Sequence, residues 1–171
     1  GPDDVDLLAR LNGPSSAHWL GTDQFGRDVW SRVMYGGRTS LAVGIGATAL
    51  GIGMGVVFGL LSGYAGGGLD LVIQRLMDAV MALPPIILLM VLATTLSPSL
   101  RNVIIAISIL ITPGASRVVR GATLGTKEML YIEAARAIGA SAPRIVFRHV
   151  LPNVMAPIIV IASISVGSAI M

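Results

Sequence analysis

The sequence contains no cysteine and few charged or aromatic residues. Of its 171 residues, 54% are hydrophobic, 12% are charged and 5% are aromatic, whereas soluble domains carry about a quarter charged residues. The lack of cysteine excludes disulfides, thiolate catalysis and cysteine-ligated metal or iron–sulfur sites. So few charges would not cover a soluble protein, and a disordered chain needs low hydrophobicity with high charge. The sequence therefore predicts one domain that lies in a lipid bilayer.

The charges that are present fall into two groups. Residues 1–40 hold four Arg and five Asp, a net charge of −1, and residues 41–171 hold eight Lys and Arg against four Asp and Glu, a net charge of +4. Six of those eight bases lie between Arg117 and Arg148. A basic cluster between apolar segments is typical of a cytoplasmic loop. Nucleic acid is not an expected partner, because the basic stretch has no interleaved aromatics and no recognition motif.

Four uncharged runs predict an all-α, polytopic membrane helix bundle within residues 41–171. The first run, from Thr39 to Leu69, is longer than the roughly 30 Å hydrocarbon core requires, so only part of it is placed in the bilayer. The third run needs the side chains of Arg117 and Arg120 to reach the interface. The expected spans are about 41–63, 79–97, 102–121 and 154–171.

Residues 1–40 are expected to form an external, periplasmic-side segment. They open with three aspartates within six residues and lack the apolar core of a signal peptide. Within them, Asp28–Tyr35 is predicted to be a short amphipathic helix, because Trp30 and Tyr35 suit a membrane interface. If the basic loop is cytoplasmic, the alternation of loops puts this acidic segment outside.

Two features of the predicted spans bear on packing and motion. Five small residues recur at every fourth position of the first span and form a strip that another helix can approach closely: Ala47, Gly51, Gly55, Gly59 and Gly63. Prolines remove hydrogen-bond donors at membrane depth in the second and third spans. They are either static kinks or hinges that line a pathway: Pro84, Pro85, Pro113 and the adjacent Gly114.

Residues 126–153 are predicted to form a loop of two short helices. Thr126 is placed as the cap of the first helix, Gly139 ends it and Ser141 caps the second, which Pro152 stops. Four residues of the first helix share a small, partly apolar face: Tyr131, Ala134, Ala135 and Ile138. Such a face suits either docking into a groove of another protein or lying on anionic lipid.

The same loop resembles the EAA signature of permease subunits of bacterial ABC importers, in the run Glu133-Ala134-Ala135, then Gly139, then Leu151-Pro152. The resemblance implies a coupling helix that sits in a cleft of a cytoplasmic ATPase. It departs from the pattern at His149, where a branched residue is expected. The residues to which it assigns ATPase coupling are Tyr131, Glu133, Ala134, Ala135, Ile138, Gly139, Leu151 and Pro152.

A second stretch narrows the family. The run HWLGTDQFGRDV at 18–29, followed by Ser31-Arg32, Tyr35-Gly36 and Arg38, is similar to dipeptide/oligopeptide/nickel permeases of the DppC/OppC type. The runs at 75–85 and 113–121 fit the same family. The resemblance implies the MetI-like ABC permease fold and a fragment that lacks helices at both ends. The GTDQFGRDV stretch either braces the membrane helices or contacts a binding protein.

The resemblance implies a non-catalytic permease subunit that moves di- or oligopeptides into the cell by alternating access, in a bacterial or archaeal inner membrane. The expected partners are two cytoplasmic ATPase subunits, which would bind ATP and Mg, a second permease of the DppB/OppB type and an extracytoplasmic substrate-binding protein. No cofactor or metal is expected on this chain. The alternatives are a nickel permease of the same family, an ion-gradient-driven transporter or channel, and a membrane scaffold.

Overall fold

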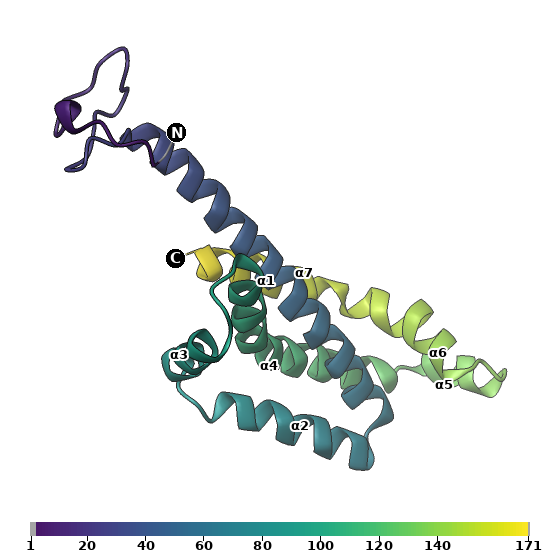
Figure 1. Cartoon of the computed structure of the whole chain (residues 1–171). Coiled ribbons are helices and arrows are strands. Elements are labelled where there is room, and N and C mark those ends of the chain that lie inside the picture. Colours follow the sequence, from purple (N-terminus) through teal and green to yellow (C-terminus); the bar gives the residue numbers. More distant parts are fainter. Residues whose placement is uncertain (1–2, 171) are drawn as a thin grey trace. The chain divides into compact units, whose positions relative to one another are not determined.

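The computed structural model describes residues 3–170 and confirms the all-α class (Figure 1). Within those residues the only strand-like pairing is an isolated bridge between Thr22 and Asp28. The elements are a 3₁₀ turn η1 (Leu7–Ala9), α1 (Val29–Ala65), α2 (Gly67–Met81), α3 (Pro85–Thr95), α4 (Leu100–Lys127), α5 (Leu130–Ala137), α6 (Ala142–Ile145), a π-helical turn η2 (Val146–Val150) and α7 (Leu151–Ile170). Contacts divide the chain into two units between Ala42 and Val43, inside α1.

The first unit is organised by the carboxylate of Asp23. One of its oxygens accepts hydrogen bonds from the backbone N–H groups of Phe25 and Arg27, at 2.8 and 3.1 Å. The other accepts from the guanidinium groups of Arg27 and Arg32, at 2.9 and 3.0 Å. Gly26 has φ +77°, and a Cβ there would collide with the carbonyl oxygen of Asp6. The GTDQFGRDV stretch is therefore a loop fixed by its own side chains.

The predicted separate amphipathic helix at Asp28–Tyr35 is wrong. The Asp28 carboxylate accepts a hydrogen bond from the backbone N–H of Ser31 at 2.8 Å, which caps the first turn of α1. The helix then runs without a break to Ala65. No proline interrupts residues 29–65, and the adjacent Gly36 and Gly37 lower helix propensity without removing a hydrogen-bond donor.

Within residues 3–170, three helical segments are long and apolar enough to cross a membrane: α1, α4 and the continuous helix Ala142–Ala169. A fourth candidate is the pair α2 and α3, which meet at an angle of 89° (Figure 1). The predicted helix at 79–97 is therefore not continuous, because residues 79–81 end α2 and α3 begins only at Pro85. That the α2–α3 pair crosses the membrane as one span stays a prediction. Pro84 is extended at ψ 134°, since a residue before proline avoids the helical region.

The helix that contains α7 also starts earlier than predicted. Residues 142–169 are helical throughout, so Pro152 does not stop a helix but lies in the first turn of α7. The π-helical turn η2 comes directly before it, and Leu151 N–H bonds to the carbonyl of Val146. A wider turn relieves the clash between a proline ring and the preceding turn. The last residue of the predicted span 154–171, Met171, lies outside the described residues.

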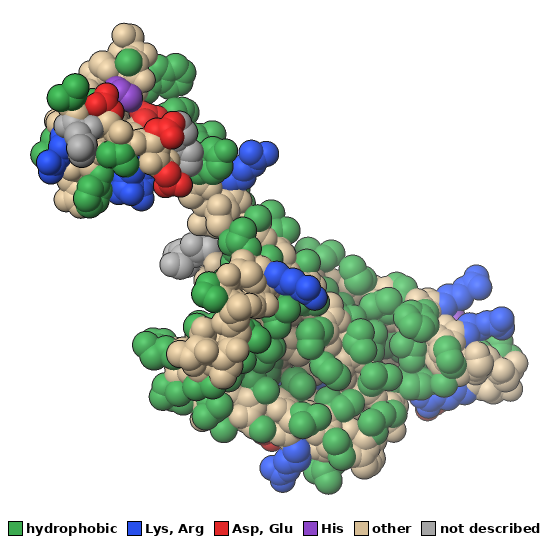
Figure 2. All heavy atoms as spheres, in the orientation of Figure 1, with side chains coloured by type: hydrophobic (Ala, Val, Ile, Leu, Met, Phe, Trp, Pro, Cys, Tyr) green, Lys and Arg blue, Asp and Glu red, His purple; other side chains and the backbone are tan. Residues whose placement is uncertain are grey.

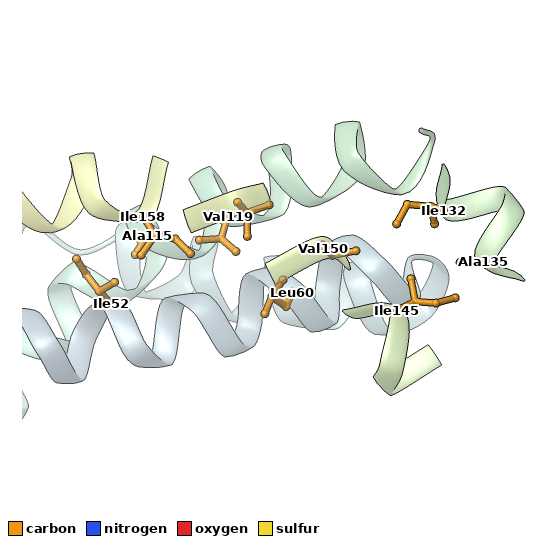
Figure 3. Close-up of a cluster of buried hydrophobic side chains, with 10 residues drawn as sticks. Ile52, Leu60, Ala115, Val119, Ile132, Ala135, Ile145, Val150 and Ile158 are labelled. Carbon is orange, nitrogen blue, oxygen red and sulfur yellow. The ribbon is translucent and has the colours of Figure 1, made fainter. Parts of the chain in front are cut away.

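The strip of small residues on α1 lies directly against α4. A Cβ added to Gly55 would come within 2.5 Å of the Ala115 Cβ, and one added to Gly59 within 2.7 Å of the Ser116 carbonyl oxygen. Thr112 Oγ1 donates to the carbonyl oxygen of Gly51 at 3.2 Å. Ala47, Gly51, Gly55, Gly59 and Gly63 are all buried. Figure 3 shows Ile52 and Leu60 of α1 in the same apolar cluster as Ala115 and Val119 of α4.

We expect Gly55→Ala to destabilise the second unit, because overpacking a tight contact costs about 1–3 kcal/mol. Gly53→Ala is the matched control, since a Cβ there meets nothing within 4 Å and alanine favours a helix by about 1 kcal/mol. The measurement is the thermal midpoint of helical circular dichroism in detergent. A midpoint that Gly55→Ala leaves unchanged or raises would contradict the packing described above.

The first unit is expected to lose structure in acid. Burial raises the pKa of the Asp23 carboxyl, but hydrogen bonds from the Arg27 and Phe25 backbones and the Arg27 side chain outweigh this effect and lower that pKa from 3.8 to about 2. The stabilisation is therefore complete above about pH 4 and is lost as the pH falls through about 2. Hydrogen bonds from Ser31 also lower the pKa of Asp28. Protonation of either carboxylate in acid therefore destabilises the first unit.

The two tryptophans of the chain report on this transition, because the rings of Trp19 and Trp30 lie 5.5 Å apart within the first unit. Near-ultraviolet circular dichroism followed from about pH 5 to about pH 2 should lose the coupled tryptophan signal. In Asp23→Asn the signal should be weakened already at neutral pH. The control Asp3→Asn removes an exposed carboxylate of the same unit and should behave as the wild type.

Candidate functional site

The loop between α4 and α7 begins later than the sequence predicts. Thr126 is not a cap, because α4 continues to Lys127 and the Thr126 hydroxyl donates to the carbonyl of Ala122 at 2.8 Å. Met129 precedes α5 in an extended conformation and makes no side-chain cap. Lys127 Nζ donates to the carbonyl oxygen of Gly63 at 2.9 Å. The end of α4 is therefore fastened to the end of α1, and the loop starts from a fixed point.

The short helix α5 has one buried side and two exposed sides. Ile132 and Ala135 are buried in the apolar cluster, together with Ile145 from α6 and Val150 (Figure 3). Ala135 therefore supports the helix from inside and exposes only a small part of its side chain. The guanidinium of Arg136 lies 5.6 Å from the ring of Tyr64, a further contact between α5 and α1.

One exposed side of α5 forms what we call the outer face, defined by Leu130, Glu133 and Ala137. These residues share a side through their spacing of three and four, and all three are exposed. Leu130 is 82% exposed. Glu133 forms no ion pair with the residues that the structure describes. The outer face thus presents an apolar side chain and an unneutralised carboxylate.

The other exposed side lines a groove with α6 and η2, which we call the α5–α6 groove. Its volume is about 470 Å³, and its lining residues are Tyr131, Ala134, Ala135, Ile138, Gly139, Ala140, Arg144, Arg148 and His149. The four residues predicted to share a face thus line one concavity. The rings of Tyr131 and His149 are 6.4 Å apart across it. Figure 2 shows basic side chains at the α5–α6 end of the second unit.

Gly139 makes the turn that closes this groove. Its φ is +79°, a region that side chains with a Cβ avoid. Its N–H bonds to the carbonyl of Arg136 at 2.9 Å, and the Ala140 N–H bonds to the carbonyl of Ala135 at 3.0 Å. This pair of bonds ends α5 with a Schellman motif. Beyond the groove, Leu151 packs against the apolar cluster, whereas Pro152 is exposed.

A partly buried polar cluster that the sequence did not reveal joins α1, α2 and α4. The guanidinium of Arg120 donates to both carboxylate oxygens of Asp70, at 2.7 and 2.6 Å. Ser62 of α1 donates to the same carboxylate, and Gln74 Nε2 donates to the Ser62 hydroxyl at 3.0 Å. Arg120 is therefore held by Asp70, and its expected place at the membrane interface stays a prediction. The only signal in the sequence is one acidic and one basic residue in apolar surroundings.

A second, more exposed ion pair connects the same two helices. Arg117 Nη2 lies 2.6 Å from Asp78 Oδ1, and both side chains are 46% exposed. The residues of the Asp70–Arg120 pair are 18% and 32% exposed. Because both pairs join α2 to α4, these helices are fixed in register at two points. Within α2, the guanidinium of Arg75 lies farther from the Asp78 carboxylate, at 3.9 Å.

The hinge candidates lie at two different kinds of position. Pro84 and Pro85 form the corner between α2 and α3. Pro113 is fully buried inside α4, where the helix continues without a break. A small cavity of about 90 Å³ lies beside it, and a Cβ on Gly114 would meet nothing within 4 Å. Whether any of them moves stays a prediction.

Comparison with known proteins identifies close relatives. Residues 55–171 match the family model described as "Binding-protein-dependent transport system inner membrane component". The chain is 44% identical over 162 residues to the dipeptide transport system permease protein DppC of Alkalihalophilus pseudofirmus, covering 95% of this chain and 53% of that protein. It is 42% identical over 170 residues to the probable D,D-dipeptide transport system permease protein DdpC of Escherichia coli, covering 99% and 57%.

A third relative is the glutathione transport system permease protein GsiD of Pectobacterium atrosepticum. The identity is 44% over 162 residues, which cover 94% of this chain and 54% of that protein. The chain thus spans about half the length of the curated relatives it matches.

We expect Arg120→Gln to destabilise the second unit more than Arg117→Gln does. Removing one partner of a fully buried pair costs about 3–5 kcal/mol, and we expect about half of that for Arg120 because its side chain remains partly exposed. The exposed Asp78–Arg117 pair is worth about 0–1 kcal/mol. The measurement is the urea midpoint of each variant in the same detergent. Equal midpoints for the two variants would show that the Asp70–Arg120 pair does not hold α2 on α4.

Proposed function

Because the chain belongs to the binding-protein-dependent transport system inner membrane component family, we propose that it forms the membrane core of a permease subunit in an ATP-driven importer of di- or oligopeptides. The chain itself performs no chemistry in this proposal. ATP and Mg²⁺ bind to two cytoplasmic ATPase subunits, and a second homologous permease completes the pathway. An extracytoplasmic binding protein delivers the peptide to the side that carries the first unit.

The observation that carries the proposal is the way in which α5 is mounted. Its outer face is exposed, while Ile132 and Ala135 fix its opposite side in the apolar cluster. A short helix with few contacts of its own would be displaced by a partner. A short helix that is fixed in the apolar cluster and packs on α4 transmits a push to the spanning helices, because packed interiors are not readily compressed.

The proposed path of motion runs through α4. Closure of the ATPases displaces α5, and α4 follows because the end of α4 lies only three residues before α5. The Asp70–Arg120 and Asp78–Arg117 pairs then carry α2, and with it the corner at Pro84 and Pro85. The bent α2–α3 pair is the element whose tilt changes between inward-open and outward-open states.

The relatives support peptides as the substrate class. Their names specify dipeptides, D,D-dipeptides and glutathione, itself a small peptide. A nickel permease of the same family is the alternative that the sequence resemblance leaves open. An ion-gradient-driven transporter would use an unpaired ionisable group at membrane depth, whereas Arg120 neutralises Asp70.

We expect Glu133→Gln to weaken coupling while leaving the permease folded. Loss of one charged hydrogen bond to the ATPase would weaken docking by roughly 10- to 100-fold. The measurements are co-purification of the ATPase subunits and uptake of a labelled dipeptide into proteoliposomes.

The matched control is Glu128→Gln, which makes the same chemical change at an exposed residue outside α5. It should retain docking and uptake. A second variant, Gly139→Val, should reduce both, because a β-branched residue at φ +79° would distort the end of α5. Normal docking and uptake in both Glu133→Gln and Gly139→Val would overturn the proposed role of this loop.

A further inference from the structure

The end of α1 and the start of α2 are joined by a single residue. The helix α1 ends at Ala65 and α2 begins at Gly67 (Figure 1), and we call residues 63–67 the α1–α2 junction. Gly66 and Gly67 have φ +67° and +55°, which lets the chain change direction without a longer loop. The Asp70 N–H bonds to the carbonyl of Gly66 at 3.2 Å. A displacement of the junction therefore moves the first turn of α2.

Two cationic side chains, one from α4 and one from α5, contact this junction. Lys127 Nζ, at the end of α4, donates to the carbonyl oxygen of Gly63 at 2.9 Å, where a cation also interacts favourably with the helix dipole. On α5, the guanidinium carbon of Arg136 lies 5.6 Å from the centroid of the Tyr64 ring. This distance is within the range of a cation–π contact. The two helices thus reach adjacent residues of α1.

The contact between Arg136 and Tyr64 is supported from both sides. Arg136 is exposed and forms no ion pair with the residues that the structure describes, so no carboxylate competes with the ring. Tyr64 is half-buried and packs against the apolar cluster to which Ile132 and Ala135 of α5 belong. The Tyr64 ring therefore contacts the cluster with its apolar body and α5 through the guanidinium group.

We infer that Arg136 is a positioning residue for transport, which links α5 to the α1–α2 junction through Tyr64. This inference rests on the proposed function, in which the ATPases displace α5. A push on α4 alone would shear its close contact with α1, and tight packing opposes such a displacement. The contact between Arg136 and Tyr64 applies the same push to α1. The helices α1 and α4 then move together, and α2 follows both.

The competing role for Arg136 is a direct bond to an acidic side chain of the ATPase. At 100° per residue, Arg136 lies between Ile132 on the buried side of α5 and Glu133 on the outer face, and its guanidinium group lies near the Tyr64 ring. The two roles differ in what they require of Tyr64. Loss of its ring impairs transport only when Arg136 acts through α1.

The test uses the assembled transporter in proteoliposomes and measures two quantities: the amount of ATPase subunit that co-purifies and the labelled dipeptide taken up per ATP hydrolysed. A cation–π contact at a partly exposed site is worth roughly two- to five-fold in an equilibrium constant. Tyr64→Leu and Arg136→Gln should each lower uptake per ATP by roughly that factor and leave co-purification unchanged. The double variant should lower uptake no further, because both changes remove the same contact.

Conservative variants and matched controls distinguish this role from a general loss of structure. Tyr64→Phe keeps the aromatic face and Arg136→Lys keeps the cation, so both should retain more uptake per ATP than Tyr64→Leu and Arg136→Gln. Tyr35→Leu and Arg101→Gln make the same chemical changes at exposed residues outside the α1–α2 junction and α5. Both controls should leave co-purification and uptake per ATP at the wild-type level.

Wild-type uptake per ATP in Tyr64→Leu would overturn the inference, and so would single effects that multiply in the double variant. Loss of the ATPase subunits from Arg136→Gln but not from Tyr64→Leu would overturn it in favour of a direct bond to the ATPase. The proposed function would fail in a different way, through absence of ATP-driven uptake in the wild type or through normal docking and uptake in both Glu133→Gln and Gly139→Val. Either result would overturn this inference as well.

Discussion

The close approach of α1 to α4 is the contact on which the rest of the second unit depends. Glycines at every fourth position of α1 let the backbones approach until Thr112 bonds to the carbonyl of Gly51. Lys127 repeats such a contact at Gly63, near the end of both helices. Because helices in lipid gain little from burying apolar surface against each other, packing and interhelical hydrogen bonds have to hold them together. The elements α2, α3, α5, η2 and α7 all contact α4.

The Asp70–Arg120 pair has a different role from the glycine contact. Removing two charges from water costs several kcal/mol per ion. The attraction between the two charges offsets roughly the same amount of free energy. The pair therefore adds little net stability, but a displaced α2 would leave two charges without partners. Ser62 bonds to the same carboxylate and brings α1 into the arrangement. The glycine contact thus holds α1 and α4 together, whereas the Asp70–Arg120 pair selects one register of α2 on α4.

The sequence predicts those features that are encoded by local spacing. The glycine strip follows from a period of four residues. The turn at Gly139 follows from the preference for glycine, which tolerates a positive φ, at the end of a helix. Both features are present in the structure. The 89° corner was missed because a proline pair shows where a helix stops but not the direction in which the chain continues. The Asp70–Arg120 pair joins residues fifty positions apart, and no local pattern records such a contact.

The helix α5 combines two tasks on eight residues. Its buried side is part of the apolar cluster, and on the proposed function its outer face receives the ATPase. A helix with a period of 3.6 residues offers separate sides for these tasks when residues recur at three and four. Small side chains at Ala134 and Ala135 allow this, because a larger residue at Ala135 would lift α5 from the cluster and one at Ala134 would fill the groove. Small side chains at the two alanines of the EAA run thus keep the groove open and allow α5 to pack on the apolar cluster.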